Sequence, residues 1–429
     1  MRTGPPVMGI LIFLAVLLLV DWYVFTGIRP LTAGLEVRTR KIIHWSYWAI
    51  NIGLFAWFIL GFFVAGDSGR QAMPRSFMTF MGIWLLFFVP KLIFGIFLLG
   101  EDIYRLFHGG IALVNNAVSE TPMQVGQSRR KFIGMIAAGV AAIPFVGILH
   151  GMSRGKFRFT VRREDIWLPD LPEAFDGFTI TQLSDIHVGS FDPESDRQAV
   201  EEGIALANAQ KSDLFVFTGD LVNNMASEME PWINSFNKLR APYGQFSILG
   251  NHDYGDYVGW ESATAKEANM QRLYAIHSEV GFKLMRNEHT VIEKDGQQLF
   301  LLGVENWGHG FGQRGDLDKA LLNVPQNAFK VLLSHDPSHF DHVVSEHKTP
   351  VHLTLSGHTH GMQFGIEIPG VKFSPVQFRY PHWAGLYQET RRYLYVNRGF
   401  GFLAFPGRVG IWPEVAVLTL RRGNAPAKG

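Results

Sequence analysis

Four long apolar stretches near the start of the chain constrain its fold more than any other feature. Each contains at most one charged residue, and together they cover about residues 7–25, 42–66, 77–100 and 132–149. A helix of about 20 apolar residues spans the hydrocarbon core of a bilayer, where backbone has to satisfy its own hydrogen bonds. We therefore expect a membrane domain at residues 1–150 with four transmembrane helices. The fourth stretch is the least hydrophobic, and a buried helix of a soluble domain is the alternative for it.

Two basic features of this region need a separate interpretation. Lys91, beside Pro90, is the one charge in the third stretch. A charge inside the membrane is by default a functional hypothesis, but we favour a lysine that snorkels or faces a partner helix. Arg129 and Arg130 precede the fourth stretch and resemble a twin-arginine export signal, although their position is internal. The alternative is an ordinary positive flank on the cytoplasmic side.

Basic residues near the helix ends predict the orientation of the membrane domain. They gather between the first two stretches and between the last two, at Arg29, Arg38, Arg40, Lys41, Arg105, Arg129, Arg130 and Lys131. These two loops share a side of the membrane, and the positive-inside rule makes it the cytoplasm. Further basic residues follow the fourth stretch, but they begin a large domain, whose translocation depends less on charge. We therefore predict that the N-terminus and residues 151–429 lie on the extracytoplasmic, or periplasmic, side of the membrane.

Composition excludes several classes of function. The formal net charge of the 429 residues is +1, which gives no electrostatic case for nucleic-acid binding. The absence of cysteine excludes disulfide frameworks and thiolate metal sites. Hydrophobic residues make up 47% of the chain, and its mean hydropathy of +0.08 is high for a soluble enzyme because of the first third.

Five stretches of the second region share one pattern, an apolar run that leads into a short polar loop. The runs are typical of buried strands, and the loops of the turns that follow them. In chain order, these segments are 178–187, 213–220, 245–253, 329–336 and 351–361. In open α/β sheets, sites form at the C-terminal ends of strands. We therefore expect the polar residues of the five loops to meet at one edge of the sheet.

These loops contain a set of side chains that suits a metal. The set is Asp185, His187, Asp220, Asn251, His335, His358 and His360. It offers oxygen and nitrogen ligands without sulfur, which suits divalent Mn, Fe or Zn. Any single Asp or Asn of the set is more simply explained as a loop residue that bonds its own backbone, so the inference rests on the set as a whole.

The order of these residues resembles that of the calcineurin-like metallophosphoesterase superfamily. The matching motifs are Asp-x-His at 185–187, Gly-Asp at 219–220, Gly-Asn-His-Asp at 250–253, a lone histidine at 335 and Gly-His-x-His at 357–360. The resemblance covers roughly residues 160–420, and segments 385–387 and 395–399 look like those of membrane-anchored bacterial members. It implies a four-layer α/β/β/α sandwich over residues 151–429, whereas the alternation of strands and helices alone indicates only an α/β fold.

The resemblance also implies a reaction and the residues that perform it. Two divalent ions (Mn, Fe or Zn) would activate a water molecule that hydrolyses a phosphomonoester or phosphodiester. By resemblance, one ion is held by Asp185, His187, Asp220 and His360, and the other by Asp220, Asn251, His335 and His358. His252 is then the catalytic residue, which donates a proton to the leaving group or binds a phosphate oxygen.

Asn223 departs from the family pattern. In many relatives, an acidic residue three positions after the Gly-Asp aspartate orients the histidine that stands here at 252. Asn223 can accept a hydrogen bond from that ring but cannot stabilise its charged form as a carboxylate does. Asp253 is the nearest carboxylate in the sequence. The mode of acid catalysis is therefore open, and the expected metal site is unaffected.

Other residues of this region have two interpretations each. Arg398 binds a phosphate or forms a structural ion pair, and Asp336 is more simply a turn residue than a ligand. Trp307 and His309 lie in a glycine-rich loop and either reach the substrate or serve the fold. The apolar loop 400–406 packs against the sheet or forms a rim that touches the bilayer or an acyl chain.

Together, these features predict a membrane-anchored metallophosphoesterase of the bacterial envelope whose substrate is a phosphoester, with a phospholipid or lipid-linked phosphate as the first candidate. Its partner is the bilayer, and we expect no nucleic acid and no obligate protein partner. One alternative is a tethered nucleotide or cyclic-nucleotide phosphodiesterase. A non-catalytic metallo-scaffold or membrane sensor is the other, against which the complete ligand set and His252 argue.

Overall fold

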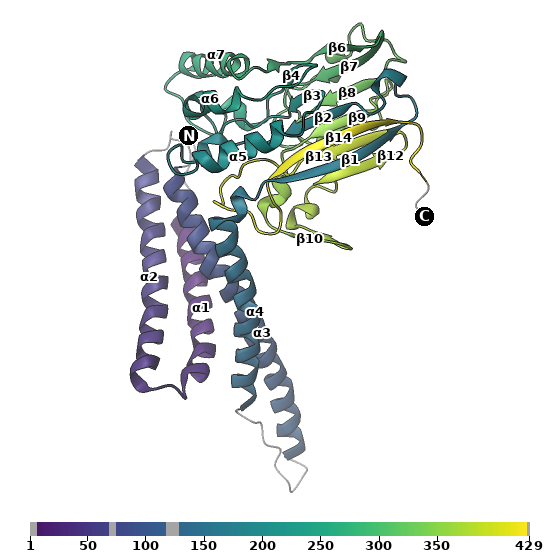
Figure 1. The fold of residues 1–429 in the computed structure, drawn as a ribbon. Helices are drawn as coiled ribbons and strands as arrows, with labels where there is room; N and C mark the ends of the chain where they lie inside the picture. The colour runs from purple at the N-terminus through teal and green to yellow at the C-terminus, as the bar shows by residue number, and fades with distance from the viewer. Residues whose placement is uncertain (1–6, 68–73, 117–127, 427–429) are drawn as a thin grey trace. The chain divides into compact units, whose positions relative to one another are not determined.

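The computed structural model of the protein describes residues 7–67, 74–116 and 128–426 (Figure 1). It divides into two compact units, which are described here one at a time. The helical unit comprises Met1–Asp67 with Thr79–His150, and the sheet unit comprises Ser68–Met78 with Gly151–Gly429.

Four long helices build the helical unit: α1 (Val7–Thr32), α2 (Val37–Asp67), α3 (Arg75–Asn116) and α4 (Ser128–Ser153). All four are long and apolar enough to cross a membrane. Large apolar side chains point outward, with exposed fractions of 63% for Leu19, 66% for Ile96 and 71% for Ile143. Such a surface suits lipid rather than water as the surrounding solvent. The four helices expected from the sequence are therefore present, each longer than the apolar stretch that predicted it.

A polar cluster joins three of these helices near their midpoints. The ammonium group of Lys91 donates to Asp21 Oδ1 at 2.5 Å and to Asn51 Oδ1 at 2.6 Å. The hydroxyl of Tyr47 donates to the backbone oxygen of Asp21 at 2.7 Å. Because a buried charge is tolerated only when it is paired and hydrogen-bonded, these contacts explain how α3 carries a lysine. Lys91 thus faces partner helices, as the favoured interpretation predicted.

The paired arginines before the fourth stretch also have partners inside the helical unit. Arg130 Nη1 lies 2.6 Å from Asp102 Oδ1, and its Nη2 donates to Thr26 Oγ1 at 3.3 Å. The guanidinium of Arg129 lies 3.5 Å from the centre of the Tyr104 ring. Both arginines therefore stabilise the packing of α4 against its neighbours, a role that fits a positive flank. The twin-arginine signal stays a prediction.

Two six-stranded sheets form the centre of the sheet unit. The first has the order β1 (Thr160–Leu168), β14 (Glu414–Arg422), β2 (Thr179–Leu183), β3 (Leu214–Phe217), β4 (Gln245–Ser247) and β5 (Lys283–Leu284). The second has the order β12 (Gly385–Glu389), β13 (Arg392–Val396), β9 (Leu353–Ser356), β8 (Lys330–Leu333), β7 (Gln297–Gly303) and β6 (Glu288–Lys294). The neighbours β2, β3 and β4 are parallel, as are β7, β8 and β9. A separate two-stranded ribbon is made of β10 (Ile366–Ile368) and β11 (Val371–Phe373).

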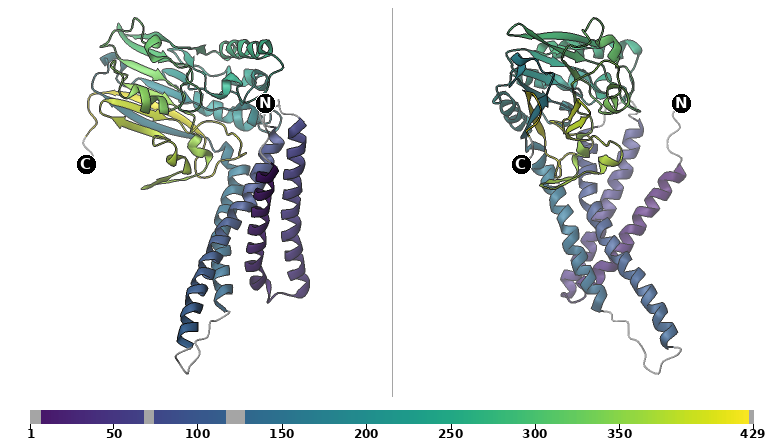
Figure 2. Two further views of the ribbon diagram at one scale, coloured as in Figure 1. Left: turned by 180° about the vertical axis from the view of Figure 1, so that it is seen from behind. Right: turned by 90° about the vertical axis from the view of Figure 1, so that its right-hand side faces the viewer.

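The sheets pack face to face with helices outside, which gives four layers (Figure 2). The central strands are buried on both faces, as in other parallel sheets: Val216 of β3 faces Val331 of β8 in the core between the sheets. Phe217 faces the other way, into the core beneath α5 (Arg197–Asn208) and α7 (Ala263–Glu279). The outer core of the second sheet includes residues of α8 (Leu317–Ala320). The α/β/β/α sandwich is therefore confirmed.

Local turn signals predicted some connections and missed others. The Asp295-Gly296 pair has φ angles of 49° and 74° and joins the antiparallel strands β6 and β7, as the hairpin signal predicts. By contrast, the polar composition of residues 254–275 is typical of a loop, but much of this stretch is helix α7. Helix α7 begins at Ala263 because the Ser262 side chain caps it by accepting from the Ala265 amide at 3.0 Å.

The ion pair between Lys91 and Asp21 predicts how single and double substitutions change the stability of the folded protein. Lys91→Met leaves the Asp21 carboxylate unpaired among apolar side chains, and breaking such a pair costs about 3–5 kcal/mol. We expect Lys91→Met to lower the temperature at which half of the detergent-solubilised protein aggregates, and Asp21→Asn combined with Lys91→Met to recover at least half of the loss. Equal temperatures for the single variant and the wild type would contradict this account.

His277 predicts a pH dependence of stability in the sheet unit. Its Nδ1 bonds Ser247 Oγ at 2.9 Å, and burial lowers its pKa to about 4. The unfolded ring titrates near 6.5, so the unfolded state binds more protons between these values and stability falls as the pH falls through this window. The loss from pH 7.5 to 5 is about 2 kcal/mol. We expect the midpoint of thermal unfolding, followed by circular dichroism, to be lower at pH 5 than at pH 7.5, and His277→Gln should reduce this difference. An unchanged difference would refute the role given to His277.

Candidate metal centre

The predicted ligands follow the ends of five strands. Asp185 and His187 follow β2, Asp220 follows β3, and Asn251 comes soon after β4. The other three come from the second sheet, where His335 follows β8, and His358 and His360 follow β9. The structure brings all seven residues together, as the pattern of strand and loop predicts.

Five of these residues have left-handed backbone conformations. The φ angles are 51° for Asp185, 46° for His187, 60° for Asp220, 70° for His358 and 51° for His360. Non-glycine residues rarely adopt positive φ, and such strain, which costs about 1–3 kcal/mol a residue, gathers at functional sites. The loops therefore hold these five side chains in place with a strained backbone.

Two glycines allow the loops to approach each other. A Cβ at Gly250 would lie 2.2 Å from Asp220 Oδ1, and one at Gly357 would lie 1.9 Å from Ser184 Oγ. No heavier side chain fits at such distances. Gly250 thus lets the loops after β3 and β4 of the first sheet approach each other, and Gly357 brings the loop after β9 of the second sheet against the loop after β2 of the first.

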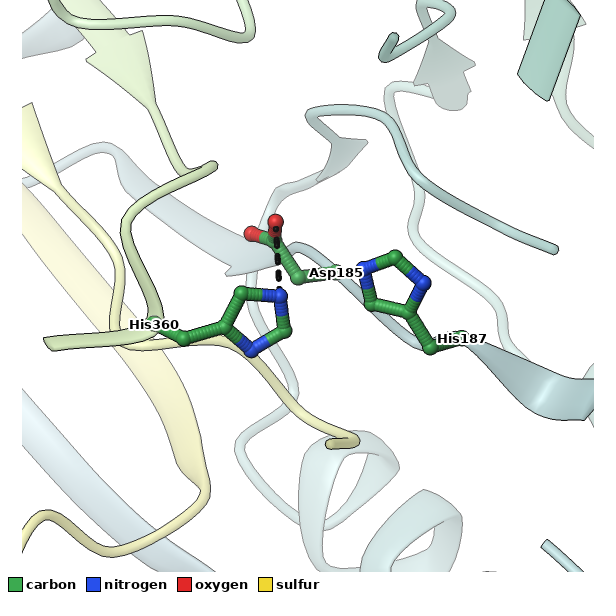
Figure 3. A group of neighbouring side chains, drawn as sticks. All are labelled: Asp185, His187 and His360. Carbon is green, nitrogen blue, oxygen red and sulfur yellow. Dashed lines mark ion pairs between the residues drawn. The ribbon is translucent and has the colours of Figure 1, made fainter. Parts of the chain in front are cut away.

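Asp185, His187 and His360 form a first group of buried side chains (Figure 3). Their ligand atoms all lie within 4.8 Å of one another, and His360 Nε2 is 3.4 Å from Asp185 Oδ1. Asp185 Oδ1 also accepts from the His358 amide at 2.9 Å. This last contact ties the loop after β2 in the first sheet to the loop after β9 in the second.

Asp220, His335 and His358 form a second group with the same close spacing. Asp220 Oδ2 lies 3.2 Å from His335 Nε2 and 3.4 Å from His187 Nε2, a member of the first group. Asn251 joins through its Oδ1, which is 2.9 Å from His358 Nδ1. Asp220 therefore lies between the two groups, where a carboxylate shared by two ions has to lie.

Unpaired imidazole nitrogens test whether these residues suit a metal. Nε2 of His187, His335 and His360 is buried and has no hydrogen-bond partner among the described residues. The Nδ1 of His335 lies 2.7 Å from the backbone oxygen of Thr218, which only accepts, so this Nδ1 carries the proton and Nε2 offers a lone pair. Metal-bound histidines are held in this way through the other ring nitrogen. The chemistry of the group thus fits a divalent ion with nitrogen and oxygen ligands.

His252 lies beside this cluster, with its ring centre 4.9 Å from that of His187. Burial lowers the pKa of His252 to about 4, so the ring is neutral at pH 7. Its Nδ1 donates to the backbone oxygen of Asn223 at 2.8 Å, which leaves the lone pair on Nε2. The ring can therefore accept a proton or a hydrogen bond as it stands, and it has to be protonated before it can act as an acid.

The side chain of Asn223 serves a different histidine from the one the resemblance implied. Its Oδ1 lies 3.2 Å from His187 Nδ1, whereas His252 is held by the Asn223 backbone. Asp253 does not orient His252 either. Its carboxylate accepts from the amides of Asp220 and Gly250 at 2.9 and 2.8 Å, which joins the loops after β3 and β4. Sequence proximity could not reveal which group orients which ring.

Asp336 and Tyr380 contact His358 and were not expected to do so. Asp336 Oδ1 accepts from the Ser338 amide at 2.8 Å, as a turn residue does. Its other oxygen is buried and lies 3.3 Å from His358 Nε2, and the Tyr380 hydroxyl lies 2.8 Å from the same nitrogen. These contacts direct Nδ1 of His358 toward Asn251. Tyr380 has no motif around it and could not have been found from the sequence.

The remaining candidates contact neighbouring side chains. Arg398 forms a structural ion pair, with its guanidinium 2.6 Å from Glu367 and 2.7 Å from Glu414. The ring of Trp307 stacks on His339 and that of His309 on His342, and contact of either residue with a substrate stays a prediction. The aromatic residues of loop 400–406 are at most 5% exposed, so the interpretation of this loop as a rim for lipid was wrong. Each ring packs on an aromatic neighbour: Phe400 on Phe236 of α6 (Ile233–Phe236), Phe402 on Phe191, and Phe405 on Phe364.

Comparisons with known proteins agree with the geometry. A family described as "Calcineurin-like phosphoesterase" matches residues 178–362, and "Probable Calcineurin-like phosphoesterase, transmembrane domain" matches residues 7–156. The metallophosphoesterase YkuE of Bacillus subtilis, itself called uncharacterized, is 31% identical over 303 residues, which are 69% of this chain and 99% of YkuE. This chain belongs to the calcineurin-like phosphoesterases. The family resemblance drawn from the motifs is thereby confirmed.

Two further relatives carry names that state an activity. Phosphodiesterase YaeI of Escherichia coli is 30% identical over 303 residues, 68% of this chain and 99% of YaeI. The UDP-2,3-diacylglucosamine pyrophosphatase LpxG of Chlamydia muridarum is 26% identical over 281 residues, 54% of this chain and 81% of LpxG. As a member of this metal-dependent family with a matching transmembrane domain, the protein is a membrane-bound phosphoester hydrolase.

The contact between Asn223 and His187 predicts an effect on metal affinity. Asn223→Ala removes the Oδ1 partner of His187 Nδ1 but keeps the backbone oxygen that holds His252. Loss of such a supporting partner weakens metal binding about 10–100-fold, and we expect this weakening when Mn²⁺ is titrated calorimetrically into the stripped full-length protein. Asn223→Asp should retain affinity, and the exposed Asn234→Ala is the control. Wild-type affinity in Asn223→Ala would contradict the assigned contact.

Proposed function

We propose that the protein uses two divalent ions to hydrolyse a lipid-linked phosphoester at the outer face of a bacterial inner membrane. The observation that carries the proposal is the position of Asp220, whose carboxylate lies 3.2 Å from His335 and 3.4 Å from His187. One carboxylate within reach of two ligand groups is the arrangement that a pair of ions requires. Mn, Fe and Zn all suit the nitrogen and oxygen donors.

Two ions would share the seven predicted ligands. One would be held by Asp185, His187, Asp220 and His360, and the other by Asp220, Asn251, His335 and His358. When bound, such ions neutralise phosphate oxygens and make a water molecule acidic. Asn251 is oriented for its part, because its amide nitrogen donates to the Tyr257 hydroxyl at 2.8 Å and its oxygen turns toward His358.

His252 is the residue that moves a proton. Its ring is fixed through Nδ1 by the backbone oxygen of Asn223 at 2.8 Å, and Nε2 carries the lone pair. Burial holds its pKa at about 4, and a phosphate dianion beside the ring would raise it by favouring the charged form. A proton taken up with the substrate can then pass from Nε2 to the leaving oxygen.

Topology and one relative support a lipid-linked substrate. Four helices that each cross the bilayer return the chain to the side from which it started, so the N-terminus and the sheet unit share a side. Basic residues in the helix segments that flank the α1–α2 and α3–α4 connections favour the cytoplasm for the opposite side. LpxG, whose name gives a diacylated substrate with a pyrophosphate bond, is 26% identical. A membrane-bound hydrolase meets such amphiphiles in its own bilayer.

A tethered phosphodiesterase for a soluble substrate is the second candidate. An open cleft of about 340 Å³ favours it, since the walls include Lys266, Arg286 and Arg314 together with Tyr254. Cations and aromatic rings in one cleft suit a nucleotide. However, Arg286 is paired with Glu305 at 3.2 Å and Arg314 with Asp256 at 2.9 Å, which leaves less charge for a ligand.

Hydrolysis by the full-length protein in detergent tests both candidates. We expect the metal-stripped protein to be inactive and to regain activity, with two ions per chain by mass spectrometry, when Mn²⁺ or Zn²⁺ is added. The substrates are bis(p-nitrophenyl) phosphate, p-nitrophenyl phosphate and a phospholipid in mixed micelles, and the fastest of them identifies the bond and its class.

Two variants separate the roles of the residues. Asp220→Asn should lower both metal content and turnover, whereas His252→Ala should keep both ions and lose about 10²–10⁴-fold in turnover. The exposed Asp295→Asn is the matched control. A protein that binds no metal would refute the proposal and favour a scaffold. Hydrolysis that is unaffected by either substitution would place the chemistry elsewhere.

A further inference from the structure

One segment of the sheet unit exposes large apolar side chains next to each other. It runs from the loop after His360 through the β10–β11 ribbon to the turn before Tyr380, and Figure 1 shows β10 extending from the two sheets. The exposed residues are Met362 (54%), Ile366 (51%), Ile368 (59%), Val371 (48%), Phe373 (40%) and Phe378 (81%). We call these six residues the apolar ribbon surface. Apolar residues that are exposed together mark interaction sites, whereas isolated ones do not.

The ribbon exposes its apolar face, which is the reverse of what a sheet does in water. Ile366 pairs with Phe373 and Ile368 with Val371, so both apolar pairs lie on one face. The Glu367–Lys372 pair between them lies on the other face. A two-stranded element in water normally buries the apolar face and exposes the charged one.

The charged face of the ribbon is the one held against the protein. Glu367 Oε1 lies 2.6 Å from Arg398 Nη2, and Glu367 Oε2 lies 2.7 Å from Arg162 Nη2. Lys372 donates to the backbone oxygen of Ala384. These contacts fix the ribbon with its apolar face outward. The exposure of that face is therefore built into the fold.

The ribbon is also joined to the point where the chain leaves the membrane helices. The amide of Gly365 donates to Val409 O at 2.9 Å, and the amide of the adjacent Arg408 donates to Gly151 O at 3.2 Å. Gly151 belongs to the sheet unit and to the last turn of α4, a candidate transmembrane helix. Only residues 408 and 409 therefore lie between the ribbon and the last turn of a candidate transmembrane helix.

Both ends of the segment are fixed to the candidate metal centre. His360, a predicted ligand, stands two residues before Met362. At the other end, the Tyr380 hydroxyl lies 2.8 Å from His358 Nε2. The ring of Phe311, which is 37% exposed, lies 4.8 Å from that of His358. A partly exposed aromatic ring therefore lies beside one of the predicted metal ligands.

We propose that the apolar ribbon surface enters the interfacial layer of the bilayer and presents lipid to the metal centre. The bilayer is the occupant that these observations favour, because the ribbon adjoins the end of a membrane helix and its exposed face has the composition of an interfacial element. Arg379, which is exposed beside Phe378, suits the phosphate layer of the lipids. The lipid substrate rests on the proposed function, whereas the contact with the bilayer does not.

The absence of native cysteine allows a direct test in the full-length protein. Val371→Cys and, separately, Ile368→Cys are labelled with an environment-sensitive fluorophore and placed in phosphatidylcholine nanodiscs with or without spin-labelled lipid. Leu322→Cys is the matched control, since Leu322 is 65% exposed and lies outside the ribbon. We expect spin-labelled lipid to quench both ribbon labels by at least half and the control label by less than a tenth.

Two results would overturn the proposal. One is equal quenching at the ribbon and at position 322. The other is a ribbon label that is shielded from aqueous iodide but not quenched by lipid, which would assign the surface to a second copy or another protein. Quenching is measured without turnover. A protein that is inactive on every ester and still quenched at position 371 would refute the proposed function while it supports the contact with the bilayer.

Discussion

The Asp220 carboxylate is the group on which the rest of the candidate site depends. It is 2% exposed and lies within 3.4 Å of histidines from both sheets. Burial alone would raise its pKa, but the rings of His335 and His252, which are positively charged at the low pH where a carboxyl group titrates, hold the pKa well below the usual range. Its backbone is equally constrained, with a φ of 60° and an amide bound by Asp253 at 2.9 Å. Such strain persists because the surrounding loops over-determine it.

The packing of the two sheets makes that arrangement possible. Neither sheet carries a complete ligand set, since the first supplies Asp185 and Asp220 and the second supplies His335 and His358. The apolar core between the sheets fixes their register, because close-packed interiors transmit small shifts. A change of core volume far from the ligands would therefore alter the distances between them. The fold acts as the frame that holds carboxylates and imidazoles in mutual reach.

Local sequence patterns predicted the parts of the molecule that are encoded locally. An apolar run followed by a polar loop revealed the strand ends, and their order identified the family. Such patterns could not predict contacts between residues that lie far apart in the sequence. The Asn223 side chain turned to His187 rather than His252. Likewise, loop 400–406 and the ribbon are both apolar in sequence. Phe400 is buried because helices cover it, whereas Ile368 is exposed, and the sequence does not tell the two cases apart.

One rule of solvation relates the helical unit to the ribbon. In the helices, Asp21, Asn51 and Lys91 bond each other inside while apolar side chains such as Ile96 face outward. In the ribbon, Glu367 is paired inside while Ile368 and Val371 face outward. The two six-stranded sheets follow the opposite rule, as proteins in water do. Because a chain orients its apolar faces toward the least polar solvent in reach, the same bilayer explains both inversions.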